Sequence, residues 1–115
     1  MLPFDLAEAP AALVHRGGEA SALWGGAAVD VLVNNGGISS RSPAEDTAVE
    51  VDAKVMHVDY LAPVALAKGV LHGMLAQHSG SLVVVSSVQG RLALPFRTSY
   101  AGAKHALHGF FEVCA

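Results

Sequence analysis

Two short apolar runs rich in β-branched residues dominate the hydrophobic pattern of the chain. The first covers Val29–Val33 and the second covers Leu82–Val85. Runs of this length and composition are typical of strands buried in a parallel sheet. A weaker run at Leu2–Leu6 predicts a third strand at the start of the chain.

Between the two strong strands, apolar residues recur at helical spacing over Thr47–His78. Asp46 or Thr47 is the expected N-cap of this long helix, and Gly80 lies just beyond its expected end. A strand, a helix and a second strand in this order form a βαβ unit. Its crossover is expected to be right-handed.

Two further helices are expected outside this unit. One covers Ala11–Trp24, although Gly17 and Gly18 weaken its helix propensity, and the other runs from Thr98 or Ser99 to the C-terminus. The element order β-α-β-α-β-α predicts an α/β fold with an open, doubly wound parallel sheet. We found no internal repeat or linker that would divide the chain.

The composition excludes several classes of protein. The 115 residues correspond to one domain at most, and 52% hydrophobic against 15% charged residues excludes a disordered chain. Seven basic against ten acidic residues, with a net charge of −3, exclude nucleic-acid binding through a basic patch. The single cysteine, Cys114, excludes a disulfide framework, and none of the six histidines has a carboxylate or Cys partner at familiar zinc spacing. No metal site, signal peptide or membrane span is therefore predicted, and the chain as given reads as soluble.

Small polar residues follow both strong strands. Asn34–Gly37 comes after the first strand, and Ser86 and Ser87 come after the second. In open α/β sheets, ligands bind outside the carboxyl ends of the strands. Taken alone, the Asn-Asn-Gly-Gly run is equally typical of a simple turn, because both residue types tolerate positive φ.

Tyr100 and Lys104 lie four positions apart at the start of the last helix, and therefore share one face. An ammonium held near a phenol favours the phenolate, which allows a tyrosine to act as a general acid or base near neutral pH. Taken alone, the pair is equally consistent with an ordinary surface contact. Ser87 precedes Tyr100 by thirteen residues, and its hydroxyl could donate a hydrogen bond to a substrate oxygen beside that phenol.

Taken together, these motifs resemble the short-chain dehydrogenase/reductase superfamily. They are Asn34–Gly37, Gly80–Ser87 and Tyr100–Lys104, in the order and at the spacing of that family. Gly-Gly in place of the more common Ala-Gly, together with the runs Asp52–Met56 and Lys104–Phe111, is similar to the dehydrogenase/reductase member-7 branch. The resemblance implies a partial Rossmann-like domain.

The resemblance also implies an activity and a role for each site residue. The activity would be NAD(P)-dependent interconversion of an alcohol and a carbonyl compound, with NADP slightly favoured and a small substrate such as a lipid, steroid or retinoid. Tyr100 would transfer the proton, Lys104 would support Tyr100 and hold the nicotinamide ribose, and Ser87 would position the substrate oxygen. Asn34 and Gly36 would lie along the cofactor. Asp5, at the end of the expected first strand, would contact adenine.

One catalytic position departs from the family pattern. Asp59, just before Tyr60, stands where the family has an asparagine at a helix kink with a free backbone carbonyl. Because Pro63 has no N–H, it leaves the Asp59 carbonyl without its usual intrahelical donor. The added carboxylate near Lys104 favours the charged ammonium, so the resemblance implies Asp59 as a fourth catalytic residue in a weakened site. Ala103 also replaces a serine of the family.

The family pattern further includes a glycine-rich turn that binds the cofactor pyrophosphate, and neither Gly17–Gly18 nor Gly25–Ala27 has its spacing. We therefore expect residues 1–115 to form a single incomplete NAD(P)-binding domain that contains strands three to five of the family fold, truncated at both ends. In one arrangement, Leu2–Leu6 pairs with Val29–Val33 in a three-stranded sheet. Substrate identity and the choice between NAD and NADP remain open at this point.

Two functions of different class follow. The first is the oxidoreductase described above. The second is a catalytically silent fragment with an interaction role, such as homodimer formation through the long helices. Full-length relatives of the resembled branch often carry a membrane anchor of the endoplasmic reticulum, so the sequence leaves localisation undetermined.

Overall fold

The computed structural model describes residues 2–23 and 25–114. From the first helix onward, its helices and strands alternate along the chain as the hydrophobic pattern predicts. They are α1 (Pro10–Ala22), β1 (Val31–Asn34), the short 3-10 turn η1 (Ala44–Asp46), α2 (Val49–Met56), the π-helical segment η2 (His57–Leu61), α3 (Ala62–Ala76), β2 (Ser81–Val84), the 3-10 turn η3 (Val88–Gly90) and α4 (Thr98–Phe111).

The sheet formed by the described residues has two parallel strands. Val31 lies opposite Ser81 and Asn34 lies opposite Val84, so β1 and β2 run in register over their whole length. Both strong strand predictions are therefore confirmed to within two residues. The long connection through α2, η2 and α3 lies between them in sequence, as in a βαβ unit.

The expected strand at Leu2–Leu6 is wrong, and so is the three-stranded sheet. Residues 2–5 have no regular structure, and the chain turns at 6–7. Pro3 cannot donate to a strand ladder, and the Asp5 carboxylate instead accepts the backbone N–H of Ala7 at 2.9 Å. This local turn satisfies polar groups that would stay unpaired in a strand without a neighbour.

The long helix begins later than the capping residues predict. Its N-cap is Ala48, with no side-chain cap, so neither Asp46 nor Thr47 has the expected role. The Thr47 hydroxyl donates instead to the carbonyl of Pro43 at 2.7 Å, and Asp46 belongs to η1. The turn just before the helix therefore uses the Thr47 hydroxyl, and Asp46 lies inside that turn rather than at the helix N-terminus.

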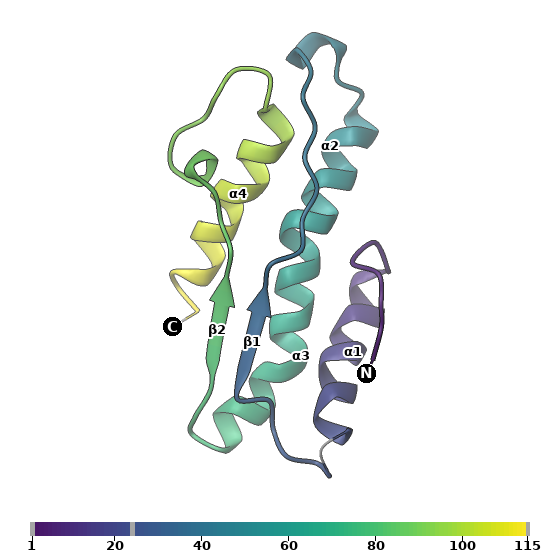
Figure 1. The fold of residues 1–115 in the computed structure, drawn as a ribbon, viewed down its shortest axis with the longest axis vertical. Helices are drawn as coiled ribbons and strands as arrows, with labels where there is room; N and C mark the ends of the chain where they lie inside the picture. The colour runs from purple at the N-terminus through teal and green to yellow at the C-terminus, as the bar shows by residue number, and fades with distance from the viewer. Residues whose placement is uncertain (1, 24, 115) are drawn as a thin grey trace.

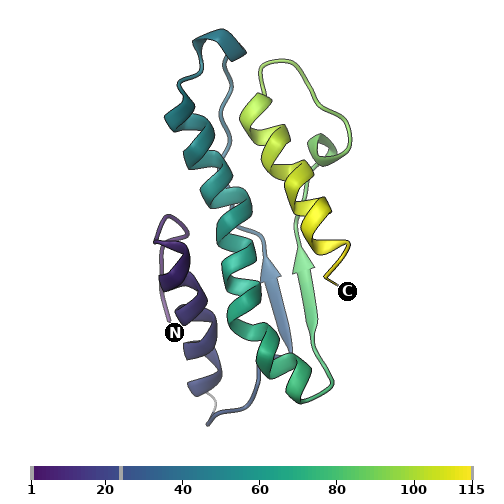
Figure 2. The same cartoon turned by 180° about the vertical axis from the view of Figure 1, so that it is seen from behind.

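The helices lie on one side of the sheet. Figure 1 shows the two strands in front of α3 and α4, and the opposite view in Figure 2 shows the helices in front of the strands. The buried cluster between these layers consists of Leu13, Ala62, Ala65 and Leu66, with Leu6 and Leu32 packed against it. The other face of the sheet exposes four valines: Val31, Val33, Val83 and Val85.

Two glycines set the distance between α1 and α3. A Cβ at Gly17 would lie 2.9 Å from the backbone oxygen of Leu66, and a Cβ at Gly69 would overlap the backbone oxygen of Val14. The helix α1 continues through Gly17, whose low helix propensity is offset because the absence of a side chain lets the two backbones pack closely. Within the described residues, none of the helices is both long and apolar enough to cross a membrane.

Candidate active site

The carboxyl ends of β1 and β2 meet the start of α4 around a small open cavity of about 210 Å³. Such an edge of an α/β sheet is where ligands bind. The cavity has backbone, hydroxyl, phenol and ammonium groups in its wall. Its lining residues are Asn35, Gly37, Ile38, Ser39, Val85, Ser86, Tyr100 and Lys104.

Tyr100 and Lys104 come from the first two turns of α4 and both line this cavity. The Lys104 ammonium nitrogen lies 5.4 Å from the centre of the Tyr100 ring. Lys104 is only 4% exposed, and its Nζ donates to the backbone carbonyl of Val85 at 3.5 Å. The i,i+4 spacing thus brings the two residues together as the sequence predicts.

Asp59 provides the counter-charge of this buried lysine. Its side chain is fully buried, and its Oδ2 lies 3.4 Å from Lys104 Nζ. Its Oδ1 accepts the backbone N–H of Ile38 at 2.7 Å, whereas Oδ2 has no hydrogen bond. The distance from Oδ2 to Nζ therefore describes an ion pair rather than a well-aligned hydrogen bond.

A π-helical turn carries Asp59 into the site. The segment His57–Leu61 has i→i+5 bonding, and the N–H of Ala62 donates to the carbonyl of His57. Pro63 follows within the next turn and has no N–H, which favours a break of the α-helical pattern here. The helix distortion implied at this position is thus present.

Gly37 adapts the loop after β1 to the Asp59 carboxylate. A Cβ at Gly37 would lie 3.1 Å from Asp59 Oδ2 and 3.3 Å from Oδ1. The next residue, Ile38, supplies the N–H that binds this same carboxylate. Sequence reasoning missed both contacts, because the Asn-Asn-Gly-Gly run indicates a turn without showing what lies beneath it.

Asn34 and Gly36 lie at the end of β1 but differ in surroundings. Asn34 is buried, and its Nδ2 donates to the carbonyl of Pro63 at 3.5 Å, which connects the strand to α3. Gly36 is exposed, and a Cβ there would overlap the side chain of Leu6. Neither residue is among the lining of the cavity that holds Tyr100 and Lys104.

Of the two serines after β2, Ser86 lines the cavity. Ser87 is half-buried, and its Oγ accepts the backbone N–H of Gln89 at 3.2 Å as the N-cap of η3. Since this bond uses the oxygen as an acceptor, the hydroxyl hydrogen of Ser87 is left for another partner. Ser87 lies at the same sheet edge as Tyr100 without being part of the cavity wall.

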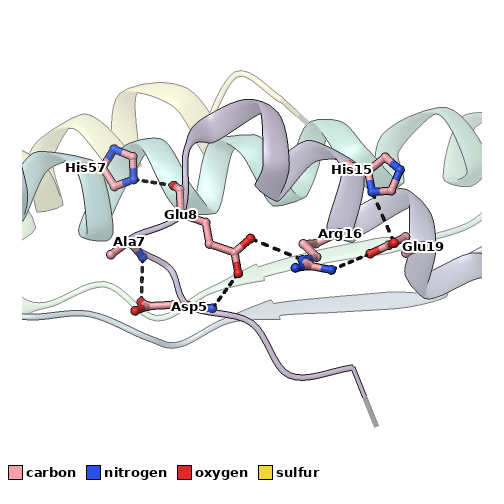
Figure 3. Close-up of polar contacts among 7 residues, drawn as sticks. All are labelled: Asp5, Ala7, Glu8, His15, Arg16, Glu19 and His57. Atoms are coloured by element: carbon pink, nitrogen blue, oxygen red, sulfur yellow. Dashed lines mark hydrogen bonds and ion pairs between the residues drawn. The ribbon is translucent and has the colours of Figure 1, made fainter.

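Asp5 is not among the lining residues of this cavity and belongs to a polar cluster at the start of α1 that Figure 3 shows. Its backbone N–H donates to the Glu8 carboxylate at 3.2 Å, and the Glu8 carbonyl contacts Nε2 of His57 at 2.8 Å. Glu8 also pairs with Arg16, whose pKa is raised by the hydrogen bond that its guanidinium donates to Glu19 and by the charge of Glu8. The cluster fixes the N-terminal segment against the helices.

One further contact supports the start of α4. The buried hydroxyl of Ser99 donates to the carboxylate of Asp52 on α2. This bond holds the turn that presents Tyr100 against the long helix. The sequence carries no signal for it, because the partners are 47 residues apart. In the part of the chain that the structure describes, no three His, Cys, Asp or Glu side chains gather as a metal site would require.

The family model described as "short chain dehydrogenase" matches residues 2–115. The chain is 44% identical over 112 residues to dehydrogenase/reductase SDR family member 7B of Rattus norvegicus, covering 97% of this chain and 34% of that protein. It is also 44% identical to dehydrogenase/reductase SDR family protein 7-like of Anopheles gambiae, with the same two coverages. The chain thus spans about a third of the length of the curated relatives it matches.

Solved structures match over nearly the same share of this chain. A short-chain dehydrogenase from Streptomyces avermitilis superposes with a TM-score of 0.89 at 28% identity, over 97% of this chain and 40% of that one. A gluconate 5-dehydrogenase from Burkholderia cenocepacia, in complex with NADP and tartrate, gives a TM-score of 0.87 at 32% identity, over 96% and 42% of the two chains. The two strands and their helices therefore correspond to part of a Rossmann-like fold.

Proposed function

The chain belongs to the short-chain dehydrogenase family, and from that premise we propose that it contributes the proton-transfer site of an NAD(P)-dependent oxidoreductase acting on an alcohol or a carbonyl compound. The observation that carries the proposal is the cluster of Tyr100, Lys104 and Asp59 at the carboxyl ends of the strands. Phenol, ammonium and carboxylate meet there beside an open cavity. This combination suits proton transfer to or from a substrate oxygen.

Tyr100 is the proposed general acid and base. Its phenol donates a proton to the oxygen of a carbonyl substrate during reduction and takes the proton back during oxidation. The positive charge of Lys104 near the ring stabilises negative charge on the phenol oxygen as the proton leaves. Asp59 holds Lys104 in place and offsets part of that charge.

Ser87 is proposed to orient the substrate oxygen. Its Oγ already accepts the N–H of Gln89, which fixes the rotamer and leaves the O–H as a donor. A substrate oxygen between this hydroxyl and the Tyr100 phenol would receive two hydrogen bonds. Such positioning restricts the substrate to one orientation for proton transfer.

The exposed backbone after β1 fits the flat end of a nicotinamide cofactor. Gly36 and Gly37 present no side chains there, and Gly37 lines the same cavity as Lys104 and Tyr100. When bound, the cofactor supplies or accepts the hydride. Asn34, Gly36, Tyr100 and Lys104 are proposed to hold it, with Asp5 at the adenine end. NADP is the favoured form, since a solved relative with 32% identity is in complex with NADP.

The first experiment is a fluorescence titration of the 115-residue chain with NADPH and NADH. We expect NADPH to bind, and we expect Lys104→Ala to abolish this binding. Lys68→Ala is the matched control, because Lys68 is an exposed lysine of α3 outside the cavity. Equal binding by both variants would contradict the proposed cofactor site.

The second experiment separates proton transfer from binding. Tyr100→Phe removes only the phenol oxygen, so we expect the rate of carbonyl reduction to fall at least about 100-fold. Cofactor affinity should stay within about twofold of the parent chain. If the rate were unchanged while the cofactor still bound, Tyr100 would not be the proton donor.

The coverage of the relatives favours one alternative. Because the chain spans about a third of their length, these residues could be catalytically silent by themselves and act through their long helices, for example in a homodimer. Absence of binding by either cofactor, together with a concentration-dependent increase in mass in sedimentation experiments, would support this second function. Tight cofactor binding would exclude it.

A further inference from the structure

Ser86 lies in the wall between two cavities. One is the 210 Å³ cavity that contains Tyr100 and Lys104. The other has about 230 Å³ and lies between β2 and α4, with Leu82, Val84, Ser86, Leu107, His108, Phe111 and Glu112 around it. A hydroxyl in this position can reach a small molecule in either space.

The Ser86 hydroxyl begins a chain of hydrogen bonds along α4. Its Oγ lies 2.9 Å from Nε2 of His108, and Nδ1 of His108 lies 3.2 Å from Oε1 of Glu112. A carboxylate can only accept, so Nδ1 carries the imidazole hydrogen and Nε2 accepts from the serine. Hydroxyl, imidazole and carboxylate thus stand in the order that activates a serine nucleophile.

Neighbouring residues support the arrangement of these three side chains. Gly90 has no side chain, and a Cβ there would lie 2.7 Å from both Ser86 Oγ and His108 Cδ2. The guanidinium of Arg91 pairs with the same Oε1 of Glu112 that His108 contacts. The hydrogen bond from His108, followed by the charge of Arg91, lowers the pKa of Glu112 and so favours its ionised form.

We propose that Ser86, His108 and Glu112 form an acyl-transfer site that hydrolyses small activated esters, a reaction that needs no nicotinamide cofactor. The two cavities are small, so the acyl group is of acetyl size and the leaving group is an aryl alcohol. The apolar residues Leu82 and Phe111 line the same cavity as Ser86 and suit an aromatic ring.

The reaction proceeds in two balanced steps. Ser86 Oγ forms a bond to the acyl carbon, its proton passes to His108 Nε2, and the bond to the aryl oxygen breaks as that oxygen takes the proton. Water then attacks the acyl serine, gives its proton to His108 and releases a carboxylic acid, and Ser86 recovers its proton. The hydroxyl of Tyr100 and the ammonium of Lys104 line the same cavity as Ser86 and can stabilise the negative oxygen that develops.

The test uses 4-nitrophenyl acetate with the 115-residue chain and no nicotinamide cofactor. We expect an initial burst of one nitrophenolate per chain, an acetyl group on Ser86 in the peptide mass spectrum, and a steady rate above background. Ser86→Ala should abolish the burst, and His108→Gln should lower its rate at least about 100-fold. Circular dichroism of each variant checks that the fold is retained.

Two matched controls show whether the effect belongs to these side chains. His105→Gln changes a histidine of the same helix whose Nδ1 contacts the carbonyl of Ala101, and Ser81→Ala changes an exposed serine at the other end of β2. Both should react like the parent chain. Acetyl groups on lysines or Tyr100 but not on Ser86, or equal rates for folded His108→Gln and the parent, would overturn the proposal.

Discussion

Asp59 is the residue whose chemistry differs most from what the family resemblance implies, because a carboxylate stands there instead of an amide. Its side chain is fully buried beside Lys104, which is nearly as well buried. An isolated charge in such a place would be very costly, so each residue depends on the other. The Asp59–Lys104 pair should therefore affect the stability of the fold as well as proton transfer.

Replacement of Asp59 by Asn should leave a buried ammonium without a counter-charge. We expect the free energy of unfolding to fall by about 3 kcal/mol, as measured by urea denaturation. Lys104→Met in the same background removes the uncompensated ammonium and should recover part of that loss. Glu50→Gln, which changes an exposed carboxylate of α2, is the control. Strictly additive effects of the two substitutions would contradict the coupling.

From the lowered pKa of Glu112 we predict that the stability of the chain depends on pH. Its pKa in the folded chain is lowered below the ordinary value of 4.5, first by the hydrogen bond from His108 and then by Arg91. A lowered pKa contributes stability above pH 4.5, and this contribution is lost as the pH falls through the folded value. Thermal midpoints of the parent chain should therefore exceed those of Glu112→Gln at pH 6 and converge with them in more acidic buffer. Parallel curves would contradict the assignment.

At the scale of elements, the sequence predicts the helices, because the contacts that stabilise them lie between residues close together in the sequence. The long helix and α4 follow from apolar spacing, and the helix distortion at Asp59 follows from the missing N–H of Pro63. The expected strand at Leu2–Leu6 failed because a strand depends on a neighbour, which local sequence does not reveal.

In the candidate site too, contacts between residues near in sequence are predictable and contacts between distant residues are not. The i,i+4 spacing of Tyr100 and Lys104 predicts their proximity from sequence alone. The hydrogen bond from Ile38 to Asp59 and the one between Ser86 and His108 join residues 21 and 22 positions apart through loops. Their geometry depends on how the loops pack on the helices, so no pattern of residue types could predict them.

The close contact between α1 and α3 predicts how substitution of its glycines changes stability. Gly69→Ala would place a methyl group against the backbone of Val14, so the helices must move apart, and we expect stability to fall by about 1–3 kcal/mol. Gly18→Ala is the matched control, since no atom lies within 4 Å of a Cβ there. It should instead raise stability by about 0.5–1 kcal/mol through helix propensity. Urea denaturation measures both, and equal effects would contradict close backbone packing.

At the scale of the whole molecule, the helices of the described residues cover one face of the sheet and leave the other bare, as the two opposite views show. The bare face carries Val31, Val33, Val83 and Val85, which are between 43% and 56% exposed. Valines at adjoining positions of paired strands form one apolar patch rather than scattered contacts. Such a patch favours association with other apolar surfaces.

This patch should control the solution behaviour of the chain. In Val33→Lys/Val83→Glu, opposite charges face each other across the two strands, so the ladder is retained while the patch is lost. We expect lower light scattering at high protein concentration and weaker fluorescence of an apolar dye, with an unchanged circular dichroism spectrum. Val49→Lys is the control, because this valine is 74% exposed at the start of α2, outside the sheet. Equal effects of both changes would mean that added charge, rather than the uncovered sheet face, determines association.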